Sequence, residues 1–190
     1  MNGKLFLILG PSGVGKGTII QRLQKELKDF IYPLSCTTRP KRPDEIDGKM
    51  YYFISKKNFL EKKENGEFLE NACVHGQAYY GILKKPVLEN LKAGKNLIRE
   101  VDIQGLFQIK KNLPKEKIVT IFLRPPSLDF LQKNILKRGP IADKELNSRI
   151  QSAEKELAKS TECDYIITAK EDDLETEIKE IKKVILKNIN

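Results

Sequence analysis

Short apolar runs that alternate with helical repeats are the main pattern along this 190-residue chain. Four runs have the length of a single buried strand: Leu5–Leu9, Leu97–Val101, Ile118–Leu123 and Tyr165–Thr168. Continuous apolar runs of this kind are typical of parallel strands that are covered on both faces. Helical spacing of apolar residues follows each run, from Lys16 onward and then over Ile103–Lys111, Ser127–Lys137 and Leu174–Lys187. Strands that alternate with helices predict an α/β fold with a parallel sheet.

Two stretches interrupt this alternation. Residues 36–87 are rich in turns and aromatic side chains, so we expect a small inserted lobe there. Within residues 126–154, the charged stretch Arg138–Glu154 predicts a mobile connection between two helices, which makes the region a candidate lid. The remaining ranges, 1–35, 88–125 and 155–190, would then form the core.

The composition fits a globular protein without a membrane segment. Hydrophobic residues make up 39% of the chain and charged residues 32%. No apolar run approaches the ~20 residues that span a bilayer. The first apolar run leads directly into Gly10 and not into a signal-peptide cleavage site. We therefore expect a cytoplasmic protein with no membrane contact.

The net charge of +9 indicates anionic partners, either nucleic acid or phosphorylated small molecules. Most lysines are interleaved with glutamates, which is typical of solvated helix faces, and no nucleic-acid recognition module is visible. We therefore expect small phosphorylated ligands and no nucleic acid. Cys36, Cys73 and Cys163 lie far apart and form no CxxC pair, which argues against a zinc site or a disulfide framework.

The strongest chemical signal lies between the first apolar run and the helix that follows it. It reads Gly10-Pro11-Ser12-Gly13-Val14-Gly15-Lys16-Gly17-Thr18. Glycines let the backbone curl until successive N–H groups point at phosphate oxygens, and the helix N-terminus adds partial positive charge. Lys16 can reach the outer phosphates. Gly17 stands where the general pattern has the magnesium-binding hydroxyl, and Thr18 follows one place later. This segment predicts a nucleotide phosphate site.

A second cluster of donors lies in the expected lobe. The segment Ser35–Pro43 carries Arg39 and Arg42, and Tyr51 follows shortly after it. Arginine forks and a tyrosine hydroxyl can hold a phosphate dianion in a fixed orientation. Residue by residue, the alternative interpretation is a basic surface turn.

Taken together, the ordered motifs resemble the guanylate kinase family. Beyond the two segments above, the resemblance is carried by Gly66–Glu70, Tyr79-Tyr80-Gly81, Glu100–Gly105, Pro125-Pro126-Ser127, Lys137-Arg138-Gly139 and Asp172-Asp173-Leu174. These segments cover nearly the whole chain. The resemblance implies a P-loop parallel five-stranded sheet flanked by helices, an inserted small mixed α/β lobe that binds GMP, and a helical lid.

The resemblance also implies the reaction, which is transfer of the γ-phosphoryl group of ATP to GMP or dGMP. The implied GMP-binding residues are Ser35, Arg39, Arg42, Tyr51, Glu70, Tyr80 and Asp102. The implied catalytic residues are Lys16, Arg39, Arg138 and Arg149. Mg²⁺ would arrive with ATP and bind near Thr18, Glu100 and Asp102, with no tightly bound cofactor. The protein would be a monomer or a homodimer.

Four positions depart from the family pattern. Ile82 replaces a Ser or Thr that touches guanine, and Asn134 replaces a first lid arginine. The usual Asn before Asp172-Asp173 is missing. One extra residue within Gly76–Tyr80 leaves open whether Tyr79 or Tyr80 faces the phosphate.

Three alternatives to the guanylate kinase interpretation stay open. The acceptor could be AMP or a deoxynucleotide. The chain could instead be a guanylate-kinase-like module that binds phosphorylated peptides, or a basic nucleic-acid-binding protein. His75, the one histidine, is interpreted as a structural residue of the lobe because transfer to a phosphate needs no general base.

Overall fold

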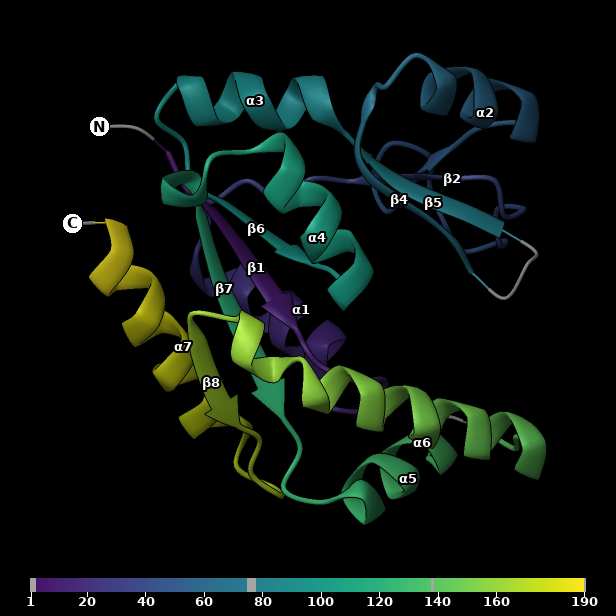
Figure 1. The fold of residues 1–190 in the computed structure, drawn as a ribbon, viewed down its shortest axis with the longest axis vertical. Helices are drawn as coiled ribbons and strands as arrows, with labels where there is room; N and C mark the ends of the chain where they lie inside the picture. The colour runs from purple at the N-terminus through teal and green to yellow at the C-terminus, as the bar shows by residue number, and fades with distance from the viewer. Residues whose placement is uncertain (1–2, 75–77, 138, 190) are drawn as a thin grey trace.

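The four apolar runs form one parallel sheet at the centre of the molecule (Figure 1). The computed structural model describes residues 3–74, 78–137 and 139–189. The strand order is β6-β1-β7-β8. The bounds are Leu5–Leu9 for β1, Leu97–Glu100 for β6, Ile118–Arg124 for β7 and Tyr165–Thr168 for β8. All three pairings are parallel, as predicted.

The expected fifth strand of this sheet is absent from the described residues, which give four strands. Ile31 forms a single parallel bridge to Leu97 on the open side of β6, where a fifth strand would lie. Its N–H and C=O pair with Asn96 and Ile98. The pairing stops there because Pro33 follows two residues later and has no N–H to donate.

Helices cover both faces of the sheet, so every residue of β1 is buried. Phe6 and Ile8 pack toward α1 (Lys16–Glu26) and α7 (Leu174–Ile189). Leu5, Leu7 and Leu9 pack on the opposite face toward α3 (Lys84–Lys92) and α4 (Ile103–Asn112). Because side chains alternate across a strand, this double coverage explains why the sequence shows unbroken apolar runs. Two 3-10 turns, Lys115–Lys117 and Ser160–Glu162, precede β7 and β8.

The inserted lobe forms its own mixed sheet, in the order β3-β2-β5-β4. The bounds are Ser35–Thr37 for β2, Tyr52–Phe53 for β3, Phe68–Val74 for β4 and Ala78–Leu83 for β5. β2 pairs in parallel with β3 and antiparallel with β5, which is antiparallel to β4. Helix α2 (Lys56–Glu64) packs on this sheet through Phe59, which stacks on Phe68 at a centroid distance of 4.4 Å. The mixed α/β lobe is thus present as expected.

Two helices, α5 (Leu128–Leu136) and α6 (Asp143–Ala158), lie across from the lobe. The expectation of a mobile connection over Arg138–Glu154 is wrong in extent, because α6 covers most of that stretch. Its charged residues alternate with an apolar stripe at helical spacing: Leu146, Ile150, Ala153 and Leu157. Such a stripe stabilises an amphipathic helix despite the high charge.

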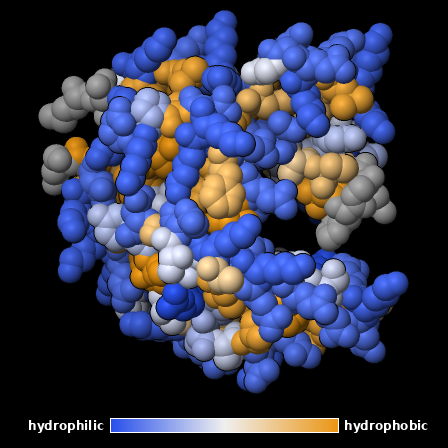
Figure 2. All heavy atoms as spheres, viewed as in Figure 1, coloured by the Kyte–Doolittle hydropathy of each residue, from blue (hydrophilic) through white to orange (hydrophobic). Residues whose placement is uncertain are grey.

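The lobe and the α5–α6 pair leave a notch between them, which is visible at the right of the space-filling view (Figure 2). The carboxyl ends of β1 and β6 point toward this notch (Figure 1). Ligands of open α/β sheets bind beyond the carboxyl ends of the strands. Among the described residues, no helix combines the length and the apolar character needed to cross a membrane.

Candidate functional site

The segment Gly10–Thr18 forms a loop that joins β1 to the first turn of α1. Gly10 has φ +140, and a Cβ there would lie 2.6 Å from the carbonyl oxygen of Leu123 on β7. Gly15 is the residue before α1 and has φ +105. Both backbone conformations favour glycine, so these two residues shape the curl that turns N–H groups outward. The Lys16 ammonium donates to the carbonyl oxygens of Gly10 at 2.5 Å and Pro11 at 3.1 Å, which holds it across the loop.

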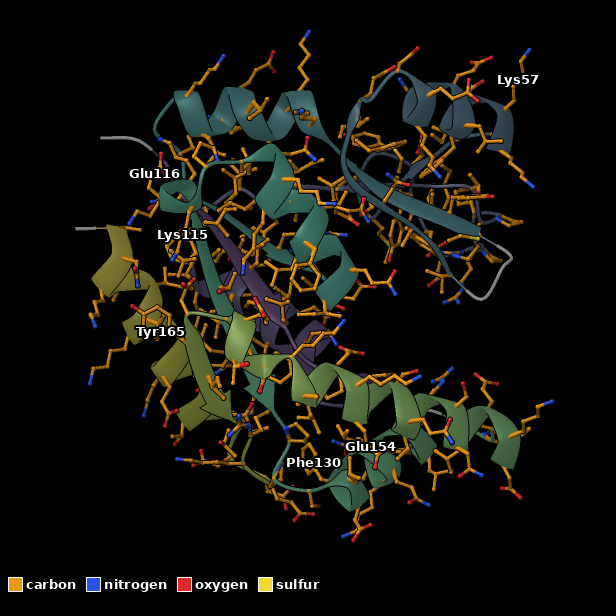
Figure 3. All side chains as sticks on the ribbon, in the orientation of Figure 1. Lys57, Lys115, Glu116, Phe130, Glu154 and Tyr165 are labelled. Atoms are coloured by element: carbon orange, nitrogen blue, oxygen red, sulfur yellow. The ribbon has the colours of Figure 1, made fainter. Side chains whose placement is uncertain are left out.

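A cavity of about 380 Å³ opens beside this loop. It lies between the start of α1, helix α5 and the segment from Lys170 to Leu174. Phe130, labelled on α5 in Figure 3, contributes an apolar wall, and Lys133, Lys137 and Lys170 contribute positive charge. Its volume falls within the range of small-molecule sites. The cavity can therefore hold the nucleoside part of a ligand whose phosphates lie in the loop.

Asn134 connects α5 to the phosphate loop. Its side-chain amide donates to the carbonyl oxygen of Gly13 at 3.0 Å. From the sequence, this residue was noted only as the replacement of a lid arginine. In the structure it links α5 to a loop carbonyl, which supports the loop conformation.

Three oxygen-bearing side chains were expected near a metal ion. Thr18, Glu100 and Asp102 are all exposed; Thr18 also lines the cavity, and Asp102 caps α4 by accepting from the N–H of Gly105 at 2.7 Å. No group of three or more His, Cys, Asp or Glu in the described residues could hold a metal alone. The donor set fits Mg²⁺ that is bound mainly by phosphates and water, with one or two protein oxygens.

Glu156 on α6 was not identified from the sequence. Its carboxyl group is half-buried near Lys16 and Asp102. Burial raises the pKa of Glu156 to about 7, the charge of Lys16 opposes this shift, and Asp102 adds to it. Apolar spacing on α6 predicts the helix face but not which acidic residue turns toward the loop.

In the lobe, Arg39 is held by a buried carboxylate. Its two terminal nitrogens donate to the two oxygens of Glu45 at 3.0 and 2.6 Å, and Glu45 is 5% exposed. Glu45 also accepts from the backbone N–H of Arg42 at 2.8 Å. Hydrogen bonds from Arg39 and then Arg42 lower the pKa of Glu45 to about 2, and Glu45, joined by Tyr80, raises the pKa of Arg39. Glu45 was not predicted from the sequence, although an acidic residue shortly after an arginine-rich run is a usable signal.

The structure distinguishes the two neighbouring tyrosines. The ring of Tyr80 meets that of Tyr51 edge-on at 5.9 Å, and the Arg39 guanidinium lies 5.8 Å from the Tyr51 centroid. Tyr79 turns the other way and packs on Phe59 at 5.4 Å. Arg39, Tyr51 and Tyr80 therefore form one cluster, with the exposed side chain of Arg42 nearby in sequence. Such a cluster can hold a phosphate dianion.

A second part of the lobe forms a pocket with different chemistry. In the strand register, Ile82 lies between Ser35 on β2 and Glu70 on β4. A Cβ on Gly105 would lie 3.3 Å from Glu70 and 3.4 Å from Asp102, so both carboxylates adjoin this glycine. Burial raises the pKa of Glu70 to about 7; Arg99 and the N–H of Ile82 oppose this shift, and Asp102 adds to it. A carboxylate in such a pocket can accept hydrogen bonds from a base.

The lid positions are described only in part. Arg149 on α6 donates to Glu145 one turn earlier, at 2.6 Å. Arg138 and His75 lie outside the described residues. A second cavity, lined in part by Lys115, Glu116 and Tyr165, lies at the amino-terminal edge of the sheet, away from the phosphate loop (Figure 3).

The phosphate loop and the arginine–tyrosine cluster thus belong to separate parts of the molecule, on the two sides of the notch (Figures 1 and 2). This arrangement provides for two phosphorylated ligands, one at the loop and one in the lobe. It is the arrangement of a phosphate-loop nucleotide kinase.

Comparison with known proteins gives the family. The family model described as guanylate kinase matches residues 2–188. Guanylate kinase from Thermotoga maritima is 44% identical over 167 residues, covering 88% of this chain and 79% of that protein. The enzyme from Carboxydothermus hydrogenoformans is 43% identical over 183 residues, covering 96% and 87%. The crystal structure of guanylate kinase from Anaplasma phagocytophilum superposes with a TM-score of 0.74 at 28% identity, covering 96% of this chain and 84% of that one. The chain belongs to the guanylate kinase family.

Proposed function

We propose that this protein transfers the γ-phosphoryl group of ATP to GMP, and also to dGMP, giving ADP and the nucleoside diphosphate. The observation that carries the proposal is the pairing of two sites across the notch. A phosphate loop with Lys16 faces a lobe in which strand β5 carries Tyr80 of the arginine–tyrosine cluster and, two residues on, Ile82, which is paired with Glu70. Family membership supports the same reaction.

In this proposal the lobe binds both the phosphate and the base of the acceptor nucleotide. Arg39, Arg42, Tyr51 and Tyr80 bind the monophosphate. Glu70 accepts hydrogen bonds from guanine N1 and the exocyclic amine, while Ser35 and Asp102 complete the base site. Adenine has no donor at N1, so a carboxylate at this place disfavours it. Nothing in the lobe is assigned to the ribose 2′-hydroxyl, which is why dGMP is included.

The transfer itself needs no covalent intermediate. The acceptor phosphate must lie in line with the γ-phosphate, and negative charge on the transferring oxygens must be neutralised. Lys16, Arg39, Arg138 and Arg149 would provide this charge from the loop, the lobe and the lid. Mg²⁺, held by Thr18, Glu100 and Asp102 together with the phosphates, would add positive charge when bound. Closure of the notch would exclude water, which competes as an acceptor.

The remaining parts of the proposal concern the setting of the reaction. All three cysteines are free thiols, which fits the reducing cytoplasm, where we place the protein. There it would contribute to GTP supply in purine metabolism.

A coupled assay with ATP and Mg²⁺ tests the proposal, with GMP, dGMP, AMP, CMP and UMP offered in turn. We expect rapid turnover of GMP, slower turnover of dGMP and little of the others. Strong turnover of AMP would overturn the base assignment. Binding of GMP without any turnover would overturn the activity and leave a binding module.

A further inference from the structure

Arg99 is a cation of the base pocket to which no role has yet been given. It lies on β6, an edge strand of the core sheet, yet its side chain reaches the segment that leads into the lobe. One terminal nitrogen donates to the carbonyl oxygen of Pro33 at 2.9 Å, and the other donates to the hydroxyl of Ser35 at 2.5 Å. Its Nε is buried and has no hydrogen-bond partner among the described residues. The guanidinium is therefore fixed in position by two bonds.

The positive charge of the same guanidinium also acts on Glu70. After burial, the charge of Arg99 has the largest influence on the Glu70 carboxyl group, and it favours the ionised form. Asp102 opposes Arg99, and the N–H of Ile82 assists it. Ile82 itself is 2% exposed and has no polar side-chain atom. Arg99 thus serves both Ser35 and Glu70, the two polar side chains that flank Ile82 in the sheet register.

The bond to Ser35 decides which way that hydroxyl can act. A hydroxyl has one hydrogen to donate, and an Arg offers only donors. Because Ser35 accepts from Arg99, its own hydrogen is directed toward some other acceptor. Guanine carries an acceptor oxygen at position 6, whereas adenine carries an amino donor there. A donor at Ser35 therefore suits a 6-oxopurine and leaves the adenine amine facing another donor.

We propose that Arg99 determines base selectivity, by fixing the Ser35 hydroxyl as a donor toward a 6-oxopurine while compensating the charge of Glu70. This inference deepens the proposed function and rests on it. Arg99 acts as a positioning residue, through Ser35 and Glu70. Inosine monophosphate is the informative probe because it keeps the 6-oxygen of guanine and lacks the exocyclic amine that Glu70 binds.

The test compares Arg99→Met and Arg99→Lys with the wild type, and uses Arg22→Met, on α1, as a matched control. Arg22 pairs with Glu26 and Glu175 on exposed surface. Dissociation constants for GMP, inosine monophosphate, AMP and ATP are measured by calorimetry, so that the result does not depend on turnover. For Arg99→Met we expect the preference for inosine monophosphate over AMP to fall about tenfold, the size of one lost polar contact. ATP affinity stays within about twofold of wild type, as expected for a site that the substitution does not touch.

Arg99→Lys should recover part of the loss, since it keeps the charge but not both bonds. If Arg99→Met fails to fold, Arg99→Lys still allows the selectivity to be measured. Ser35→Ala combined with Arg99→Met should lose less selectivity than the two single variants added together, because the part that Arg99 exerts through Ser35 is already lost in Ser35→Ala. Equal weakening of inosine monophosphate, AMP and ATP, or unchanged selectivity, would overturn the inference and leave Arg99 as a structural link. Failure of the proposed function is recognised separately, by wild-type protein that binds GMP selectively but transfers no phosphate.

Discussion

Arg39 and Glu45 form a two-pronged ion pair inside the lobe, at 3.0 and 2.6 Å. The pair fixes the plane of the guanidinium beside Tyr51 and Tyr80. A phosphate therefore meets an arginine that is already oriented, and less entropy is lost when it binds. The buried partner of a ligand-binding arginine is in this case as informative as the arginine itself.

Glu45→Gln should weaken GMP binding by loosening Arg39. A hydrogen bond between charged groups is worth about 1.5–3 kcal/mol, so we expect KM for GMP to rise about tenfold to hundredfold. KM for ATP should stay unchanged because the phosphate loop lies across the notch. Steady-state kinetics with each substrate varied in turn give both values. Glu67→Gln is the control, since Glu67 pairs with Lys62 on the outside of the same lobe; an equal effect there would contradict the role of Glu45.

The same pair predicts a stability difference that depends on pH. Arg39 lowers the pKa of Glu45 from 4.5 to about 2, so the ion pair stabilises the fold fully above pH 4.5. This stabilisation is lost as the pH falls through about 2. Thermal unfolding of wild type and Glu45→Gln should therefore differ at neutral pH and converge near pH 2. A constant difference over that range would show that Glu45 acts by packing alone.

Glu70 predicts how GMP binding depends on pH. Burial raises its pKa to about 7, and only the ionised carboxylate offers both oxygens as acceptors, one for guanine N1–H and one for the exocyclic amine. Below pH 7, binding must first remove a proton, so affinity should fall roughly tenfold for each further pH unit. Calorimetry between pH 5.5 and 8 in buffers of different ionisation enthalpy measures both affinity and proton release. The GMP phosphate also titrates near pH ~6, and Glu70→Gln separates the two because only the phosphate contribution should remain.

Asn134 predicts a selective effect on ATP. Asn134→Ala removes the bond to the Gly13 carbonyl and frees this part of the phosphate loop. A neutral hydrogen bond contributes about 0.5–1.5 kcal/mol, so KM for ATP should rise roughly threefold to tenfold while KM for GMP is unchanged. Gln132→Ala, on the exposed side of the same helix, is the matched control. A rise in both KM values would mean that Asn134 acts on the whole notch.

Two glycines of the phosphate loop predict opposite effects on stability. Gly10→Ala places a Cβ against the Leu123 carbonyl in a backbone conformation that favours glycine, so we expect a loss of about 1–3 kcal/mol or more. Gly17 lies in α1 with open space around its Cα, and Gly17→Ala should stabilise the protein by about 0.5–1 kcal/mol. Urea unfolding of both variants measures the two changes. Similar values for both would refute the loop geometry.

Much of the fold was predictable because apolar runs report burial directly. The strands Leu5–Leu9 and Tyr165–Thr168 have the predicted bounds, although only the first is buried throughout and the second is an edge strand with Ile166 and Thr168 exposed. The missing fifth strand was less predictable, because one bridge at Ile31 depends on where Pro33 falls relative to the sheet edge. The length of helix α6 was not predicted, because many charged residues separate the apolar residues of its stripe in the sequence.

The residues of the site likewise fall into those that the sequence could predict and those that it could not. The phosphate loop is local in sequence, so its glycines and Lys16 were recognised from spacing alone. Arg99 and Glu156 lie at positions that only the packing of distant elements brings near Glu70 and Lys16. No periodicity distinguishes them from a solvated arginine or glutamate.

The two halves of the acceptor site pack on hydrophobic clusters of different size. Leu69 and Ile82, beside the base pocket, belong to the large core that includes α3 and α4. The outer lobe rests on a separate cluster whose fully buried members are Cys36, Phe59 and Phe68. Regions with few buried contacts open more often in the native state. Backbone amides of α2 should therefore exchange with solvent sooner than those of β4. The protein should therefore populate states in which the outer lobe has released the monophosphate while the base pocket still binds the guanine.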